Sequence, residues 1–412
     1  MSCESLDLDR LAERIGTPCY VYSKAAFVER YRSWADAFAW GGGTVAYAIK
    51  ANSHHGVLKA LAAEGAGADT VSVGEIRKAL KAGVPARRIV FSGMGKTDVE
   101  LSFALTHPEL QINVESRPEL ERLKTLARAS SARPVVVLRV NPDVSAGGHD
   151  KISTGRAHDK FGLPIEEAMA LYREASSDGA LNIAGLACHI GSQIFDVAPF
   201  EAAWRRLAEM TVALREDGLT VSRLDLGGGL GIDYGDGSAP SNPATPADLG
   251  AAARRIFGDL GVELSVEPGR WISAPSGILL ASVTHVNTRA SGLRFLVLDA
   301  GMNDLARPSL YDAFHRIEPL VARHGETLPY DVVGPICESS DVFARDRMLP
   351  ALAAADRVAL MDAGAYGAAM ASTYNSRDLP AEVLVDGSRW TVTRTRQIVE
   401  EDNDGLSDGL TT

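Results

Sequence analysis

Several features that would mark a specialised protein are scarce in this chain of 412 residues. Cysteine occurs only four times, and no two cysteines have CxxC spacing: Cys3, Cys19, Cys188 and Cys337. This pattern excludes a disulfide scaffold and a zinc ribbon, so we expect a reducing compartment and no metal site.

Long apolar runs and an excess of positive charge are also missing. No run of about 18 apolar residues could span a bilayer, and the opening MSCESLDLDRLAERIG lacks the apolar core of a signal peptide. With 42 Lys+Arg against 53 Asp+Glu, the formal charge is −11, which argues against nucleic-acid binding and a polybasic membrane surface. We therefore expect a cytoplasmic protein without nucleic-acid or membrane partners.

What the chain does contain is a repeated unit, a short β-branched run followed by a helical pattern. Eight such runs occur, at residues 44–52, 69–74, 88–93, 111–116, 134–142, 182–192, 223–229 and 263–269. Eight βα units within about 250 residues indicate a (β/α)₈ TIM barrel in the α/β class. An open doubly wound sheet would need GxGxxG after the first strand, and the sequence has none there.

After Gly269 the pattern changes to strands joined by turns, at residues 278–288, 293–301, 330–335, 357–364 and 381–395. They predict a β-domain of the sandwich or barrel kind, with which the early run at 19–23 should pair. The predicted organisation is a barrel over 24–272 and a β-domain built from 1–23 and 273–412. The connection from Asn141 to Gly162 is long and aperiodic, as in a lid or binding loop, although a surface insertion is the alternative.

In such barrels the active site lies at the carboxyl ends of the strands. The residues expected there are mostly polar or charged: Lys50, Asp69, Ser92, Glu115, Arg139, Asn141, His189, Ser192, Gly227 to Gly229, and Glu267 to Arg270. Few of these residue types suit a packing role, so their convergence on one rim indicates a site.

Most of these residues permit two interpretations. Lys50 is a candidate Schiff-base nucleophile or a lysine that extends from a strand end to water. Gly227, Gly228 and Gly229 follow the seventh run and EPGR the eighth, where barrels often bind phosphate, although glycine-rich turns are common. Glu267 could face a pyridine nitrogen or form an ion pair with Arg270.

Two further candidates also have an ordinary alternative. His189 could stack on a cofactor ring, transfer a proton, or serve only the structure. Cys337, in GPICESSD, could donate a proton or be a small buried hydrophobic residue.

These residues and their surroundings resemble, in order, the pyridoxal-phosphate-dependent diaminopimelate decarboxylases, of the alanine-racemase-like fold type. The similarity extends over about residues 17 to 387. The matching segments are YAIKAN, FSGMGKT, NVES, RVNPD, KISTG, KFG, HIGSQI, LDLGGGLGIDY, EPGR, DAGMNDLARPSLYDA, VVGPICESSD, DAGAYGAAMASTYNSR and AEVLVDG.

The resemblance assigns roles to individual residues. It makes Lys50 the Schiff-base lysine, His189 the stacking residue and Glu267 the partner of the pyridine nitrogen, with Asp69 near the lysine. It assigns the phosphate to the neighbourhood of Ser192, to Gly227, Gly228 and Gly229, and to the backbone of Glu267, Pro268, Gly269 and Arg270. It implies substrate contacts from Arg270, Arg307, Tyr311, Glu338 and Tyr366, the last also touching phosphate. Cys337 would be the proton donor, delivered with Glu338 from the second subunit of a homodimer.

The implied activity is decarboxylation of meso-2,6-diaminopimelate to L-lysine and CO₂, the last step of lysine biosynthesis, with pyridoxal 5′-phosphate as cofactor. Two alternatives remain open at this point. One is a decarboxylase of the same fold acting on ornithine, arginine or an antibiotic precursor, and the other is a non-enzymatic pyridoxal-phosphate-binding protein. Glu338 argues against the first, because a carboxylate suits the distal ammonium of a second amino-acid end, which diamino monoacids lack. The extra β-domain argues against the second, because such binding proteins resemble the barrel alone.

Overall fold

The computed structural model describes residues 1–144 and 160–397. The chain divides into two compact units. Residues 27–233 and 238–272 form one, called the barrel unit below, and residues 1–26, 234–237 and 273–412 form the other, called the β unit. Most of the long connection, with His149 and His158, lies outside the described residues, and so does the acidic tail from 398.

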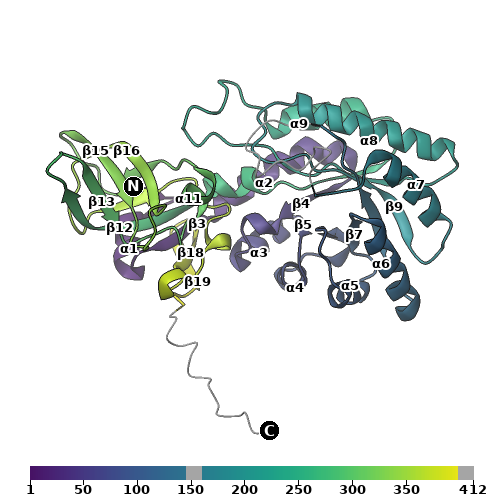
Figure 1. The fold of residues 1–412 in the computed structure, drawn as a ribbon, viewed down its shortest axis with the longest axis horizontal. Helices are drawn as coiled ribbons and strands as arrows, with labels where there is room; N and C mark the ends of the chain where they lie inside the picture. The colour runs from purple at the N-terminus through teal and green to yellow at the C-terminus, as the bar shows by residue number, and fades with distance from the viewer. Residues whose placement is uncertain (145–159, 398–412) are drawn as a thin grey trace, which may run out of the picture. The chain divides into compact units, whose positions relative to one another are not determined.

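The barrel unit contains eight parallel strands that close on themselves in the order β10-β11-β4-β5-β6-β7-β8-β9. Figure 1 labels four of them, β4, β5, β7 and β9. They are β4 (Thr44–Ala48), β5 (Gly67–Thr70), β6 (Ile89–Phe91), β7 (Gln111–Val114), β8 (Val135–Arg139), β9 (Asn182–Ala187), β10 (Arg223–Asp225) and β11 (Glu263–Val266). The predicted (β/α)₈ barrel is therefore confirmed.

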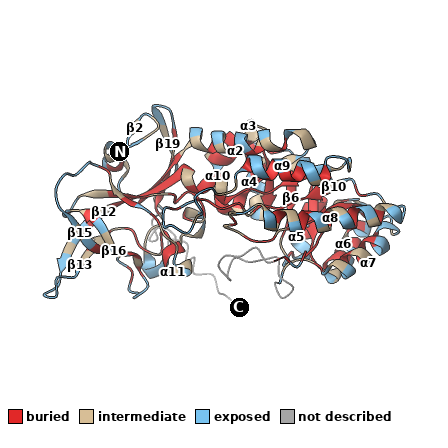
Figure 2. Ribbon diagram, turned by 90° about the horizontal axis from the view of Figure 1, so that it is seen from above, coloured by how far each residue is buried: buried red, intermediate tan, exposed pale blue. Residues whose placement is uncertain are grey.

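Helices alternate with the strands and cover the barrel, with α2 before the first strand. They are α2 (Lys24–Phe38), α3 (His55–Ala63), α4 (Val73–Ala82), α5 (Asp98–Leu105), α6 (Arg117–Ser130), α7 (Ile165–Ser176), α8 (Ala198–Glu216), α9 (Pro246–Phe257) and the short α10 (Arg270–Ser273). Figure 2 shows most of them buried on one side and exposed on the other, as amphipathic helices on a core should be. Trp204 of α8 packs its indole against Phe257 of α9, with ring centroids 6.4 Å apart.

Hydroxyl residues fix where several of these helices begin. Ser72, Thr97, Ser116 and Thr245 each accept a hydrogen bond from a backbone N–H in the first turn of the helix that follows. Each cap satisfies an N–H group that has no partner within the helix, which is typically worth about 1 kcal/mol. The caps therefore fix the far ends of the loops that follow β5, β6, β7 and β10.

The strands are shorter than the predicted runs, always at the carboxyl end. The run at 44–52 leaves the sheet after Ala48 and continues as the 3₁₀ turn η2 (Ile49–Ala51), and the run at 263–269 leaves it after Val266. The polar residues at the end of each run belong to the loops at the barrel rim, not to the ladder of strands. Because these loops carry the candidate site, the difference concerns function as well as boundaries.

The β unit contains a two-stranded sheet, β1-β2, and a branched sheet of nine strands in the order β16-β15-β13-β12-β3-β18-β19, with β17 pairing β12 and β14. The elements are β1 (Ser2–Cys3), β2 (Leu6–Asp7), α1 (Leu8–Ile15), β3 (Cys19–Ser23), β12 (Gly277–Thr288), β13 (Arg294–Leu298), α11 (Arg307–Tyr311), β14 (Ile317–Pro319), β15 (Thr327–Val333), β16 (Val342–Pro350), β17 (Arg357–Leu360), β18 (Ala381–Asp386) and β19 (Arg389–Arg394). As expected, β3 pairs with strands after the barrel, antiparallel to β12 and parallel to β18. No helix in the described ranges is both long and apolar enough to cross a membrane.

Candidate active site

Lys50 lies in the turn η2 at the carboxyl end of β4. Its Nζ is 2.7 Å from Oδ2 of Asp69, whose side chain on β5 is fully buried. The amine thus contacts a buried carboxylate inside the barrel mouth, which the strand-end alternative with an amine in bulk water does not explain. The fold brings these two predicted residues together because β4 and β5 are neighbours in the barrel.

Glu267 follows β11 and is buried, with 8% of its surface exposed. Its Oε1 has no hydrogen-bond partner within the described part of the chain. Burial, followed by the negative charges of Asp225 and Asp69, raises the pKa of Glu267 well above its ordinary 4.5. The alternative of an ion pair with Arg270 is not what the side chains show, because the Arg270 guanidinium donates to the Ser192 hydroxyl at 3.0 and 3.2 Å.

His189 follows β9 and is held as a neutral ring. The N–H of Gly228 donates to His189 Nδ1 at 3.1 Å, so this nitrogen carries no proton. Burial, followed by the positive charges of Arg139 and Lys50, lowers the pKa of His189 well below its ordinary 6.5. A neutral, fixed imidazole suits stacking on a flat ring better than donation of a proton from an imidazolium.

The three glycines after β10 form a turn that only glycine can make. A Cβ at Gly227, Gly228 or Gly229 would lie 2.3, 2.1 or 2.5 Å from the carbonyl oxygens of Cys188, Glu267 and Gly191, respectively. The N–H groups of the first two are occupied, by Asp225 Oδ1 at 3.1 Å and by His189. The N–H of Gly229 has no partner among the described residues, so Gly229 is the member of the run suited to an anion.

The candidate phosphate corner is close to this turn. Ser192 follows Gly191, whose carbonyl oxygen a Cβ at Gly229 would meet, and Ser192 accepts from Arg270. The EPGR loop is fixed to the first strand, because Ala48 donates its N–H to the Pro268 carbonyl at 3.1 Å and a Cβ at Gly269 would touch Ala48. A backbone N–H, a hydroxyl and a guanidinium are donors that suit a phosphate group.

A cavity of about 220 Å³ lies at the mouth of the barrel next to some of these groups. Lys50, His189 and Glu267 all line it, together with Arg139 and Phe161. A buried carboxylate oxygen without a partner, a neutral imidazole, an amine and a glycine turn fit a phosphorylated pyridine aldehyde such as pyridoxal phosphate. The residues of the barrel unit therefore fit this cofactor chemically.

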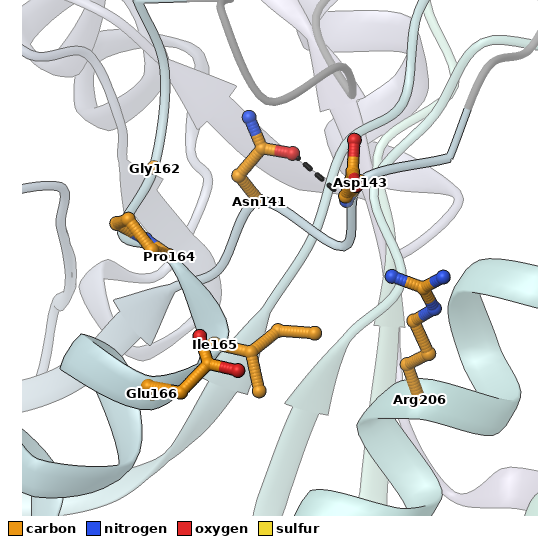
Figure 3. A pocket seen from close by; sticks show the side chains of 7 residues that line it. All are labelled: Asn141, Asp143, Gly162, Pro164, Ile165, Glu166 and Arg206. Atoms are coloured by element: carbon orange, nitrogen blue, oxygen red, sulfur yellow. Dashed lines mark hydrogen bonds between the residues drawn. The ribbon is translucent and has the colours of Figure 1, made fainter.

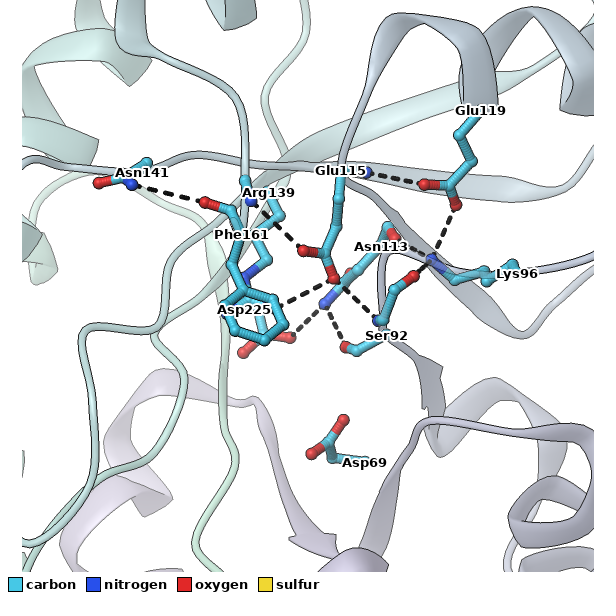
Figure 4. A network of polar contacts seen from close by, with 12 residues as sticks. Asp69, Ser92, Lys96, Asn113, Glu115, Glu119, Arg139, Asn141, Phe161 and Asp225 are labelled. Carbon is cyan, nitrogen blue, oxygen red and sulfur yellow. Dashed lines mark hydrogen bonds and ion pairs between the residues drawn. The ribbon is translucent and has the colours of Figure 1, made fainter. Parts of the chain in front are cut away.

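Arg139 lines this cavity, and its side-chain contacts there could not be predicted from its position in the sequence. Its Nη1 donates to Glu115 Oε1 at 3.0 Å, and its guanidinium lies 4.9 Å above the Phe161 ring (Figure 4). Glu115 also accepts from the N–H groups of Gly93 at 2.8 Å and Gly162 at 3.3 Å. Glu115, just after β7, thus fixes the Arg139 cation of β8 at the cavity wall, a pairing that only side-chain geometry reveals.

Asn141 points into a different hollow. Its Oδ1 accepts from the N–H of Asp143 at 3.0 Å, and both residues line a separate cavity of about 280 Å³ next to Arg206 (Figure 3). The rim residue Asn141 is therefore not part of the cavity that Lys50 lines, because its side chain caps the local turn.

In the β unit, Arg307 is buried and pre-positioned at the start of α11. Its Nη1 lies 2.9 Å from His315 Nε2, and its guanidinium is 4.6 Å from the Tyr234 ring centroid. His315 Nδ1 is 2.8 Å from the Met361 carbonyl, so Nδ1 donates there and Nε2 accepts from Arg307. Sequence reasoning assigned no role to Tyr234 or His315, although both fall within or next to the matching segments. Tyr311 ends the same short helix.

Cys337 and Glu338 lie on the turn between β15 and β16, and both are exposed. The alternative of Cys337 as a buried hydrophobic residue is therefore wrong. The N–H of Cys337 donates to Asn375 Oδ1 at 3.0 Å, and the Tyr374 hydroxyl donates to Glu338. That bond raises the pKa of Tyr374. Sequence reasoning did not single out Asn375 or Tyr374.

Tyr366 lies on the turn after β17, partly buried. Its φ of 55° is in the left-handed region, which is unusual for a bulky residue.

Comparisons with known proteins agree with this geometry. Residues 24–274 match the family model of the pyridoxal-dependent decarboxylases, pyridoxal binding domain. The chain is 46% identical over 401 residues to the diaminopimelate decarboxylase of Zymomonas mobilis, covering 97% of this chain and 94% of that one.

Two solved structures are also similar to it. One is diaminopimelate decarboxylase from Helicobacter pylori complexed with L-lysine, with a TM-score of 0.91, 37% identity and coverage of 96% of this chain and 98% of that one. The other is an SrLDC mutant in complex with PLP, with a TM-score of 0.81, 26% identity and coverage of 92% and 94%.

Proposed function

The chain belongs to the pyridoxal-dependent decarboxylases, among the diaminopimelate decarboxylases, and we propose that it converts meso-2,6-diaminopimelate to L-lysine and CO₂ with pyridoxal 5′-phosphate as cofactor. One observation carries the proposal. The buried Glu267 has a carboxylate oxygen without a described partner, in the same cavity as the Lys50 amine. This pairing suits a pyridine ring that is bound covalently at one end and through its nitrogen at the other.

When bound, the cofactor supplies an electron sink for the bond that releases CO₂. Lys50 would hold it covalently, with Asp69 keeping the amine in position. Glu267 would hold a proton at the ring nitrogen, and His189 would cover one face of the ring. Ser192, Gly229 and Arg270 would hold the phosphate, with the neighbouring glycines, Pro268 and Tyr366 shaping that corner.

We assign the substrate contacts to the remaining predicted residues. Arg307 is held in place by His315, and its planar guanidinium suits a substrate carboxylate, while Arg270, Tyr311 and Tyr366 complete that set by resemblance. Glu338 would accept the distal ammonium. Cys337 would return a proton to the α-carbon after CO₂ leaves. The last two residues would act in the site of the second subunit of a homodimer, and we place the enzyme in the cytoplasm.

The test is CO₂ release from meso-diaminopimelate, compared with L-ornithine and L-arginine, by the purified protein with added cofactor. We expect release from the first substrate and little from the others. Borohydride reduction should then fix the cofactor to the peptide that contains Lys50. Preference for ornithine or arginine would refute the substrate assignment, and a label on another lysine would refute the site.

A further inference from the structure

The interior of the barrel carries a polar column below the site that the proposed roles do not use. Arg223 Nη1 donates to Gln111 Oε1 at 3.3 Å, and Gln111 Nε2 donates to Asn113 Oδ1 at 2.8 Å. Both amides then donate to the same oxygen of Asp225, Gln111 Nε2 at 3.3 Å and Asn113 Nδ2 at 3.4 Å. Gln111, Asn113 and Asp225 are almost completely buried, at 1 to 2% exposure.

The direction of these hydrogen bonds follows from one residue. A guanidinium can only donate, so Arg223 requires the oxygen of the Gln111 amide to face it. The NH₂ of Gln111 must then face Asn113 and Asp225. That in turn orients the oxygen of Asn113 toward Gln111 and its NH₂ toward Asp225 and Ser92, the latter at 3.1 Å (Figure 4). The column is therefore oriented from Arg223 upward.

Asp225 consequently receives hydrogen bonds that are all donated to it. Its Oδ2 accepts from the two amides, and its Oδ1 accepts from the N–H of Gly227 at 3.1 Å. Hydrogen bonds donated to a carboxylate favour its ionised form. Burial is the largest influence and raises the pKa of Asp225, and the hydrogen bonds from Gly227 and Asn113 oppose that rise. The column thus supports a negative charge on Asp225 against the cost of burial.

This charge adjoins Glu267. Asp225, at the end of β10, pairs in register with Ser265 of β11, two residues before Glu267. A hydrogen bond between the Asp225 and Glu267 carboxyls is one of the contacts that lower the pKa of Asp225. Two negative charges cannot share such a space without a proton between them. The other charged groups that face Glu267 are Asp69 on β5, which also favours a proton on it, and Lys50 and Arg139, which oppose one. His189, which lines the same cavity as Glu267, is neutral.

We infer that Asp225 is a positioning residue for the pyridine end of the site: kept ionised by the Arg223–Gln111–Asn113 column, it retains a proton at the Glu267 carboxyl and, once the ring is bound, between Glu267 and the ring nitrogen. The proton shared with the ring nitrogen rests on the proposed function, whereas the proton retained at Glu267 does not. The charge also holds the N–H of Gly227, which links the pyridine end to the glycine turn.

The experiment compares Asp225→Asn with the wild type in two measurements. In the full-length protein freed of cofactor, infrared spectroscopy follows the C=O band of the protonated Glu267 carboxyl against pH, identified by its absence in Glu267→Gln. In the holoenzyme, kcat is measured against pH. We expect Asp225→Asn to lower the pH midpoint of the band by about one unit or more, a tenfold loss of proton affinity. The alkaline limb of kcat should move in the same direction while the acidic plateau changes little.

Variants at the far end of the column provide a matched pair. Arg223→Met removes the donor that orients the amides, whereas Glu263→Gln removes only the ion-pair partner of Arg223, 2.9 Å away. The first should shift the midpoint by a smaller amount in the same direction, and the second should not shift it. If Asp225→Asn does not fold, this pair decides alone.

An unchanged midpoint in Asp225→Asn, or equal shifts in the two Arg223–Glu263 variants, would overturn the inference. Failure of the proposed function is seen separately, because borohydride labelling of Lys50 reports it and the infrared midpoint needs no cofactor. A shifted midpoint with an unshifted kcat profile would retain Asp225 as the partner of Glu267 and refute its action on the bound ring.

Discussion

The barrel unit and the β unit hold their candidate site residues in opposite ways. In the barrel, Lys50 and Glu267 stand at the ends of buried strands, and side chains from other strands of the same barrel surround them. In the β unit, Cys337 and Glu338 stand on an exposed turn and are held by Asn375 and Tyr374 from another turn. Groups of the first kind are set by the architecture itself, and groups of the second kind by a few local contacts.

The difference has an energetic side. A buried charge or amide that loses its partner incurs the full cost of desolvation, about 1–3 kcal/mol or more. An exposed group that loses a partner is compensated by water. Substitutions in the barrel site should therefore affect both chemistry and folding, whereas those on the exposed turn should affect function alone.

The largest effect is expected when a substitution in each region is placed on a different subunit of the dimer. Lys50→Ala and Cys337→Ala should each be inactive or nearly so. If the two residues meet across a two-fold interface, random subunit exchange makes about half the dimers mixed, and each mixed dimer has one fully native site. Mixing the inactive proteins should therefore restore about a quarter of wild-type activity.

The matched control for this mixing is Lys50→Ala with Glu267→Gln. Both residues belong to the barrel unit, so every site in a mixed dimer keeps one defect and activity should not rise. Recovery in the control, or none in the test pair despite verified exchange, would refute the shared-site proposal. Lys59→Ala, on the exposed side of α3, should leave turnover unchanged.

The second prediction concerns Arg307, the residue of the β unit that is held as the barrel residues are. Arg307→Lys keeps the charge but loses the planar fork that binds a carboxylate through two hydrogen bonds. We expect KM to rise about ten- to a hundredfold, the equivalent of one lost charged hydrogen bond, with a smaller change in kcat. Steady-state kinetics measure this effect, and Arg389→Lys on exposed β19 serves as the control. An unchanged KM would remove Arg307 from the substrate site.

The same contrast explains what the sequence could and could not predict. Strands buried on both faces give continuous apolar runs, so the eight barrel strands were predicted from pattern and the barrel is confirmed. In the β unit, β16 was missed because Arg345, Asp346 and Arg347 interrupt its apolar residues and Asp346 adopts a φ of 46° at a bulge.

The candidate site divides similarly. Its strand-end residues were predicted because barrel topology brings the ends of all strands to one rim. The role of Asp225 was not, because it depends on which way the amides of Gln111 and Asn113 face across a barrel closed by residues more than 100 positions apart. The pairing of Arg307 with His315 could not be predicted from sequence pattern either, because a five-residue helix gives no periodic signal.

The third prediction tests whether the barrel site is as well shielded as its geometry indicates. The pKa of His189 is lowered in the folded protein, so the unfolded chain binds more protons below about pH 6.5. The stabilisation from its neutral ring is complete above that pH and is lost as the pH falls toward the folded pKa, by at most about 1.4 kcal/mol per pH unit. Denaturant unfolding of the cofactor-free protein should show this loss.

The comparison that isolates His189 uses two variants. His189→Gln should lessen the decline of unfolding free energy between pH 6.5 and lower pH, because glutamine does not titrate. His55→Gln, at an exposed position, should leave the decline as in the wild type. Equal slopes in all three proteins would mean that the ring is protonated without penalty, and the barrel would then be no better shielded than the β unit.

The smallest effect is expected at the exposed turn. Tyr374→Phe removes only the hydroxyl that donates to Glu338, and its raised pKa shows that this bond favours the protonated phenol. Because both residues are exposed, water replaces the lost donor and Glu338 gains only rotational freedom. We expect KM for meso-diaminopimelate to rise about two- to fivefold, at the low end of the range for a hydrogen bond because water competes at this exposed position, with kcat and thermal stability unchanged. Glu338→Gln keeps the shape and removes the charge, so its KM should rise more than that of Tyr374→Phe. If Tyr374→Phe instead lowers thermal stability as strongly as a barrel substitution, the exposed turn is a structural element of the β unit and the contrast between the two units fails.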